Sequence, residues 1–184
     1  EFFSKPWTTV IGPGDSIQRH AKHTRILDYE IELGIVIGKG GVDIARESAL
    51  EHVFGYTIIN DVTARDLQKR HGQWFKGKGL DTTCPMGPWV VHRSAVPDAQ
   101  ALHMELDVNG EVRQNASTQD MLFDVPAIIE QLSAGLTLHP GDVIATGTPS
   151  GVGFAMTPPR CLEPGDVIRA RIDGLGELVN TVVD

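Results

Sequence analysis

The stretch from Leu27 to Gly38 constrains the fold of this chain most, because its pattern predicts a buried β-strand that carries two carboxylates. Side chains alternate between the two faces of a strand, so the apolar residues share one face, and Glu30 and Glu32 share the other. The apolar residues of the first face are Ile31, Leu33, Ile35 and Ile37. Neighbouring carboxylates repel each other and resist removal from water, so this pair requires a cation, a shared proton or solvent. A strand with one solvated face remains an open alternative at this point.

Composition limits the class of protein that can contain this strand. The 184 residues are 41% hydrophobic and 22% charged, which suits one globular domain with a sizeable core, or two small domains. The net charge of −8 argues against a nucleic-acid-binding protein, which usually carries a basic patch. Cys84 and Cys161 form no zinc-type pair, so we expect packing thiols in a reduced, intracellular protein. Since no apolar run reaches membrane-spanning length, we expect a cytoplasmic protein with neither a membrane segment nor a signal peptide.

The rest of the chain is rich in predicted strands and poor in helices. Further strands are expected at 54–59, 89–93, 102–114 (a hairpin), 142–146, 166–172 and 177–183. The clearest helix is 124–135, in which Asp124 is the N-cap and Gly135 ends the helix. Asp43 is expected to cap a second, short helix. The sequence therefore predicts an α+β domain that is mostly β, with few and short helices.

A third carboxylate completes a candidate metal site. Asp61 follows directly after the predicted strand at 54–59, and with Glu30 and Glu32 it forms an all-oxygen trio. Such a trio suits a hard cation such as Mg²⁺, Mn²⁺ or Ca²⁺, with the remaining positions left to water or substrate. No histidine or cysteine lies close to these residues in the sequence, which makes zinc less attractive. The segment 146–153 lacks the Gly-Lys-Ser/Thr ending of a phosphate loop, so a nucleotide site is excluded.

Six phrases of the sequence carry a resemblance to a known family, and their order and spacing extend over essentially the whole chain. The phrases lie at 3–6, 27–33, 55–66, 77–88, 108–114 and 140–153. On these phrases the chain resembles the catalytic domain of the fumarylacetoacetate hydrolase family. The fold that this implies is the mixed β-roll of the family, which would form a single domain over 1–184. Members of the family usually assemble as homodimers, so we expect a homodimer here.

The resemblance also implies roles for individual residues. The metal ligands that it implies are Glu30, Glu32 and Asp61, for Mg²⁺ or Mn²⁺, with Ca²⁺ as a further candidate. The substrate-binding residues that it implies are Arg65, Gln68, Lys78 and Thr148. The resemblance also implies that Lys78 is a catalytic residue, whose side chain points at the oxygen atoms of the substrate. The implied substrate is a small anionic α-keto acid. Judged on the residues alone, Lys78 could be a solvated loop lysine, and Arg65 could pair with Asp61 or Asp66.

The function implied is a metal-dependent hydrolase that cleaves a C–C bond in a 2,4-dioxo acid of the acylpyruvate type. The alternative is an oxaloacetate decarboxylase or tautomerase, or an isomerase or hydratase of aromatic catabolism, acting on the same metal site. A non-catalytic, metal-stabilised binding module is a third interpretation, which the retention of all four substrate-binding residues disfavours. Hydrolytic relatives activate water with a His–Glu pair, which we expect in an N-terminal lid upstream of this chain. His20, His23 and His71 do not match that pair.

Overall fold

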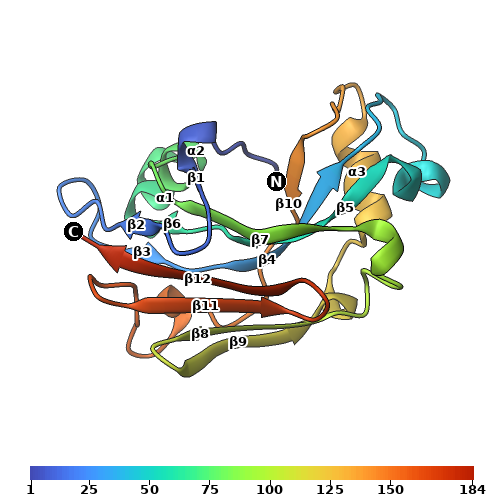
Figure 1. The fold of residues 1–184 in the computed structure, drawn as a ribbon. Helices are drawn as coiled ribbons and strands as arrows, with labels where there is room; N and C mark the ends of the chain where they lie inside the picture. The colour runs from blue at the N-terminus through green and yellow to red at the C-terminus, as the bar shows by residue number, and fades with distance from the viewer.

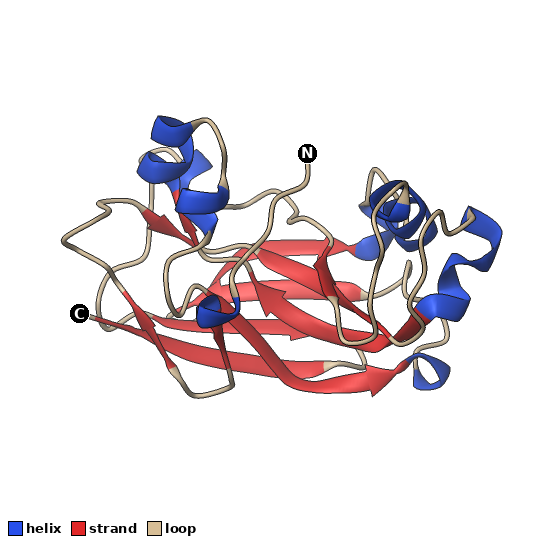
Figure 2. Cartoon of the chain, turned by 90° about the horizontal axis from the view of Figure 1, so that it is seen from above, coloured by secondary structure: helices blue, strands red, loops and turns tan.

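The computed structural model describes all of residues 1–184 and consists of two five-stranded sheets, with helices gathered at two ends (Figures 1 and 2). In order across the first sheet, the strands are β1 (Val10–Ile11), β7 (Cys84–His92), β5 (Val53–Asn60), β4 (Ile31–Ile37) and β10 (Val143–Ala145). In order across the second sheet, they are β2 (Ser16–Gln18), β12 (Gly176–Val183), β11 (Val167–Ile172), β8 (His103–Val108) and β9 (Glu111–Ser117). A two-stranded sheet pairs β3 (Leu27–Asp28) with β6 (Thr63–Ala64).

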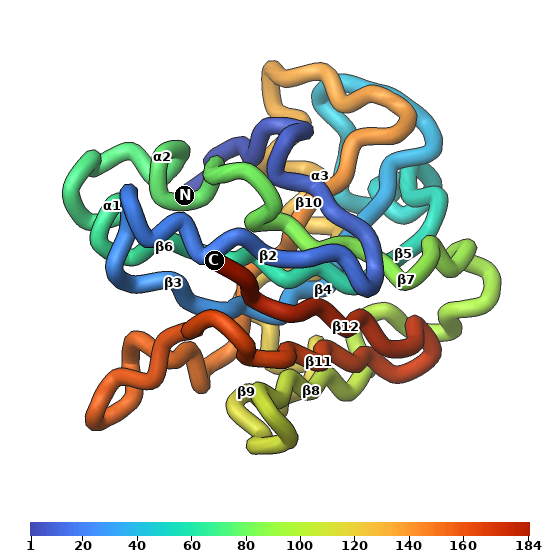
Figure 3. The backbone as a smooth tube through the Cα atoms, turned by 60° about the vertical axis from the view of Figure 1, so that its left-hand side comes forward, coloured from blue at the N-terminus to red at the C-terminus, as the bar shows by residue number.

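Both large sheets mix strand directions. The pairs β1–β7 and β2–β12 are parallel, and the other neighbours in these two sheets are antiparallel. Figure 3 shows β2, from the N-terminal part of the chain, lying beside β12 at the C-terminal end. The predicted α+β fold with mostly β structure is therefore confirmed.

The helices are short and lie outside the sheets. The α-helices are α1 (Arg65–His71), α2 (Phe75–Lys78) and α3 (Val125–Ser133). The 3₁₀ helices are η1 (Trp7–Thr9), η2 (Arg46–His52), η3 (Arg93–Ala95), η4 (Thr118–Asp120) and η5 (Gly153–Ala155). Asp124 caps α3 as predicted, since its carboxylate accepts a hydrogen bond from the Ala127 N–H at 2.9 Å. None of the helices has the length and apolar character that crossing a membrane would need.

The core lies between the two large sheets, where β4, β5 and β7 contact β8, β11 and β12. The apolar residues of β4 that the alternation predicted are all buried in this core. Glu32, on the opposite face of β4, is only 3% exposed, and Glu30, directly before the strand, is 6% exposed. The alternative of a strand with one solvated face is therefore excluded, and the two carboxylates need partners inside the protein.

The pairing of β4 with β5 places the third carboxylate beside the other two. In this antiparallel pair Ile31 lies opposite Asn60, so the chain leaves β5 where β4 begins. The N–H of Asp61 donates to the carbonyl oxygen of Glu30 at 2.8 Å, and Asn60 accepts from the N–H of Glu30 at 3.0 Å. The backbone thus holds Asp61 next to Glu30, although 31 positions separate them in the sequence.

The close approach of β5 and β7 gives a test of this packing. A Cβ added to Gly55 would lie 2.2 Å from the carbonyl oxygen of Val91, so we expect Gly55→Ala to lower the free energy of unfolding by about 1–3 kcal/mol. At Gly12 the nearest atom to an added Cβ is 3.5 Å away, so Gly12→Ala is the matched control, with a change of about 0.5 kcal/mol or less. Urea denaturation measures both variants, and equal stability of the two would contradict the predicted contact.

Candidate metal and substrate site

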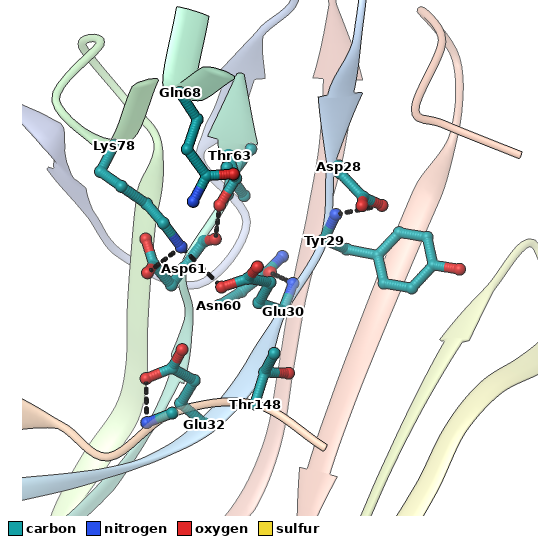
Figure 4. Close-up of polar contacts among 12 residues, drawn as sticks. Asp28, Tyr29, Glu30, Glu32, Asn60, Asp61, Thr63, Gln68, Lys78 and Thr148 are labelled. Atoms are coloured by element: carbon teal, nitrogen blue, oxygen red, sulfur yellow. Dashed lines mark hydrogen bonds and ion pairs between the residues drawn. The ribbon is translucent and has the colours of Figure 1, made fainter. Parts of the chain in front are cut away.

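Three buried carboxylates meet at the end of β4 and β5. Glu30 precedes β4, Glu32 lies within it, and Asp61 follows β5. One carboxylate oxygen from each residue lies within 4.8 Å of the other two, and all three residues are buried (Figure 4). The structure therefore brings together the three residues that the sequence and the resemblance selected as metal ligands.

Lys78, the last residue of α2, forms ion pairs with two of these carboxylates. Its Nζ lies 2.6 Å from Glu30 Oε2 and 2.6 Å from Asp61 Oδ2 (Figure 4). Only 3% of its side chain is exposed, so the alternative of a solvated loop lysine is excluded. Burial alone would lower the pKa of Lys78, but Asp61 and Glu30 outweigh it and raise that pKa above the usual range. Lys78 is therefore an ammonium group, able to donate hydrogen bonds but not to act as a base.

Arg65, the first residue of α1, approaches the same carboxylate from another side. One of its terminal nitrogens lies 2.6 Å from Glu30 Oε1, and its Nε and other terminal nitrogen each lie 2.9 Å from Asp28 Oδ2. Neither Asp61 nor Asp66, the partners left open by the sequence, pairs with it. Gln68, one turn further along α1, accepts from Arg65 at 3.3 Å. The structure thus groups Arg65 and Gln68 with the carboxylates, and the substrate-binding role that the resemblance implied for them stays a prediction.

Glu32 is the member of the trio without a cationic partner. Its carboxylate accepts a hydrogen bond from the N–H of Gly147 at 2.7 Å. Burial raises the pKa of Glu32 well above the usual range, and the charges of Asp61 and Glu30 raise it further. A divalent cation bound between the three carboxylates would lower the pKa of Glu32 again, because its charge would offset the repulsion from Asp61 and Glu30.

Asp61 also retains capacity for a cation. The Nζ of Lys5 forms an ion pair with Asp61 Oδ1 at 2.7 Å, and this buried oxygen accepts no hydrogen bond. Carboxylate oxygens carry two lone pairs each and are the ligands that Mg²⁺ and Mn²⁺ prefer. The residues present therefore fit a hard divalent cation, held by Glu30, Glu32 and Asp61.

The loop after β10 brings Thr148 to the same region. Gly147 donates to Glu32, and the next residue, Thr148, lines a groove of about 870 Å³. Polar residues such as Ser117 and apolar residues such as Phe123 and Ile128 also line this groove. Glu30, Glu32 and Asp61 do not line this groove, and the link between Thr148 and the carboxylates is the neighbouring Gly147, which binds Glu32 (Figure 4).

Sequence reasoning missed several residues that complete the site. Asp28, fully buried, binds Arg65 and also accepts from the N–H groups of Gly153 and Phe154 at 2.8 and 3.1 Å. It stands two positions before Glu30, so the same alternation could have identified it. Lys5, which also donates to the carbonyl oxygen of Lys78, stands in the first matched phrase but carried no local signal of its own.

The family of the chain follows from comparison with known proteins. Residues 1–183 match the family model described as fumarylacetoacetate (FAA) hydrolase, C-terminal. This chain belongs to the fumarylacetoacetate hydrolase family. The family resemblance carried by the six phrases is thereby confirmed.

Individual relatives of this fumarylacetoacetate hydrolase family member are named for different activities. Oxaloacetate tautomerase YisK of Bacillus subtilis (strain 168) is 56% identical over 180 residues, which cover 98% of this chain and 60% of that protein. The structure of a fumarylacetoacetate hydrolase from Exiguobacterium antarcticum superposes with a TM-score of 0.96 at 55% identity, covering 98% of this chain and 65% of that one. A 2-hydroxyhepta-2,4-diene-1,7-dioate isomerase from Mycobacterium marinum gives a TM-score of 0.90 at 45% identity, covering 98% and 68%. The chain thus spans about 60% of the length of the curated relative it matches.

The raised pKa of Glu32 predicts how stability depends on pH. Well below its usual pKa, Glu32 is protonated in both the folded and the unfolded state and its pKa shift has no effect on stability. As pH rises above that value, the unfolded state loses the proton first, so Glu32 lowers the stability of the metal-free protein. We therefore expect Glu32→Gln to raise the melting temperature in EDTA at pH 8, but not at pH 4.

The same variant tests the metal site. We expect Mg²⁺ to raise the melting temperature of the unmodified protein and to leave that of Glu32→Gln unchanged, because a neutral amide is a much weaker ligand. Glu51→Gln changes an exposed carboxylate in the same way and is the control that keeps the Mg²⁺ response. Two results would contradict this account. One is a melting temperature of Glu32→Gln that is lower than that of the unmodified protein in EDTA at pH 8. The other is a Glu32→Gln variant that Mg²⁺ still stabilises.

Proposed function

We propose that this chain forms the metal-dependent active site of an enzyme that converts the enol and keto forms of an α-keto dicarboxylic acid such as oxaloacetate. One observation carries the proposal: a buried Lys78 and a partly buried Arg65 contact Glu30 beside a trio of carboxylates that fits a divalent metal. The site therefore offers both positive charge and a place for a Lewis acid to the same anionic substrate. The 56% identity to a protein named oxaloacetate tautomerase supports this choice of reaction.

The metal belongs to the three carboxylates. Glu30, Glu32 and Asp61 would hold Mg²⁺ or Mn²⁺, with Ca²⁺ as a further candidate, and the bound ion supplies Lewis-acid stabilisation of negative charge on a carbonyl oxygen. Lys5 and Lys78 both form ion pairs with Asp61, and these contacts fix the ligand in place.

The chain's own cations would handle the substrate. Lys78 holds its proton on Nζ, and this N–H can donate to the oxygen on which charge develops as the enolate forms. Arg65, anchored by Asp28, can bind a carboxylate group, and Gln68 beside it can donate from its amide nitrogen. Thr148 would bind the same end of the substrate from the opposite loop.

Hydrolysis of a C–C bond in a 2,4-dioxo acid is the second candidate. A solved relative at 55% identity is named a fumarylacetoacetate hydrolase, and cleavage would develop charge on the same type of oxygen. Hydrolysis also requires a base that activates water. The histidines that hydrogen-bond through their side chains, His20, His52, His92 and His103, bond to groups outside the carboxylate site. The 56% identity to a protein named oxaloacetate tautomerase is what supports tautomerisation as the first candidate. The homodimer, the anionic α-keto acid substrate and the cytoplasmic location remain predictions.

Tautomerisation can be measured directly from the ultraviolet absorbance of the enol. With Mg²⁺ present, we expect the protein to accelerate the enol–keto conversion of oxaloacetate, and EDTA to abolish the effect. Lys78→Met should lower the rate by about 100-fold, because it removes a buried donor to the developing charge. Lys76→Met, an exposed lysine in the same helix, is the matched control and should retain the rate.

Three outcomes would contradict the proposal in different ways. Release of pyruvate from acylpyruvates without conversion of oxaloacetate would favour the hydrolase. A rate that Lys78→Met leaves unchanged would remove Lys78 from the mechanism. Metal binding without either activity would favour a non-catalytic binding module.

A further inference from the structure

Gln114 links the two sheets at the candidate site. It lies in β9 of the second sheet, and its side chain is fully buried. Its amide reaches β4, which belongs to the first sheet, and the loop that carries Thr148. Gln114 is the last residue of the phrase at 108–114, but the family resemblance implied no role for it, and it is not one of the metal ligands.

The hydrogen-bond partners of the Gln114 amide allow only one of its two possible orientations. Its oxygen accepts from the backbone N–H of Ile31 at 3.0 Å, and its nitrogen donates to the carbonyl oxygen of Pro149 at 3.0 Å. A backbone N–H can only donate and a carbonyl oxygen can only accept, so the amide cannot be reversed. The second N–H of the same nitrogen donates to Thr148 Oγ1 at 2.8 Å.

This orientation decides what the Thr148 hydroxyl can do. A hydroxyl has one proton to donate, and here its oxygen accepts from Gln114, so the proton is directed elsewhere. Gln114 is the hydrogen-bond partner that the structure gives to this hydroxyl, and Thr148 lines the groove next to Gly147, which donates to Glu32. The free O–H proton can therefore be donated to a ligand bound beside Glu32, whose partner Gly147 precedes Thr148 in the chain.

We propose that Gln114 is a positioning residue that fixes Thr148 as a hydrogen-bond donor toward the carboxylate of an α-keto acid. The inference rests on the proposed function, which supplies the ligand. Ile31, whose N–H donates to Gln114, stands between Glu30 and Glu32 in the sequence. The same Gln114 amide therefore connects the loop that carries Thr148 to the backbone between two metal ligands. A purely structural glutamine would stabilise the fold without acting through the Thr148 hydroxyl.

A double-mutant cycle separates these two roles. The probe is oxalate, whose adjacent carboxylate oxygens match the chelating end of an α-keto acid, titrated into Mg²⁺-loaded protein by calorimetry. We expect Thr148→Val to weaken oxalate binding by about 10- to 100-fold, since it removes a hydrogen bond to a charged group. Gln114→Met should weaken it by about tenfold in the unmodified protein and by about twofold or less in the Thr148→Val background.

Three further experiments keep the test independent of folding and of the metal. Gln114→Glu retains an acceptor for the Ile31 N–H and cannot donate to Thr148, so it goes through the same cycle if Gln114→Met does not fold. Mn²⁺ affinity without oxalate should change by about threefold or less in the Gln114 variants, because the three carboxylates are untouched. Ser133→Ala removes another buried hydrogen-bonding side chain, in α3, and should lower stability without changing oxalate affinity.

The outcomes distinguish this inference from the proposed function. Unmodified protein that does not bind oxalate with Mg²⁺ would overturn the proposed function and this inference with it. Oxalate binding that Gln114→Met leaves unchanged, or weakens equally in both backgrounds, would overturn the role of Gln114 alone. A loss of Mn²⁺ affinity as large as the loss of oxalate affinity would also overturn it, since Gln114 would then act through the metal strand.

Discussion

The buried repulsion among Glu30, Glu32 and Asp61 is the constraint on which the rest of this site depends. Three carboxylates in one buried place would oppose folding unless other groups compensated their charge. Lys78, Lys5 and Arg65 provide this compensation through direct contacts with Asp61 and Glu30. Glu32 is left with a backbone N–H and a raised pKa, which marks the position where a further positive charge is missing.

A second layer of buried polar groups holds the charged residues in place. Asp28 accepts from Arg65 and from two backbone N–H groups, so the guanidinium is held in the position from which it contacts Glu30. Asn60 and Gln114 hold the successive N–H groups of Glu30 and Ile31. Buried polar networks that are fully satisfied rigidify a site. The ligand strand is thus fixed by side chains as well as by its neighbouring strands.

Alternation along one strand was enough to predict much of the site. It placed Glu30 and Glu32 on one face and the apolar residues in the core, and Asp61 followed because it ends the paired strand. The contacts made by Lys5 and Gln114 could not be predicted in this way, because they join residues far apart in the sequence.

Local signals also failed where tertiary contacts replaced them. Asp43, expected to cap a helix, instead adopts a positive φ of 51° and accepts from the N–H of Gly135. The helix that follows is the 3₁₀ helix η2, whose N-cap is Ala45. A side chain that can cap a helix is equally able to accept from a distant backbone group, and the sequence does not distinguish the two.

The central claim is that the carboxylate trio is a metal site that works together with Lys78 and Arg65. A crystal structure of the protein with Mn²⁺ and oxalate, using the anomalous signal of manganese, tests it most directly. We predict one strong anomalous peak bonded to an oxygen of each of Glu30, Glu32 and Asp61, with oxalate bound between the ion and the two cations. The absence of such a peak, with Lys78 still alone between Glu30 and Asp61, would contradict the account.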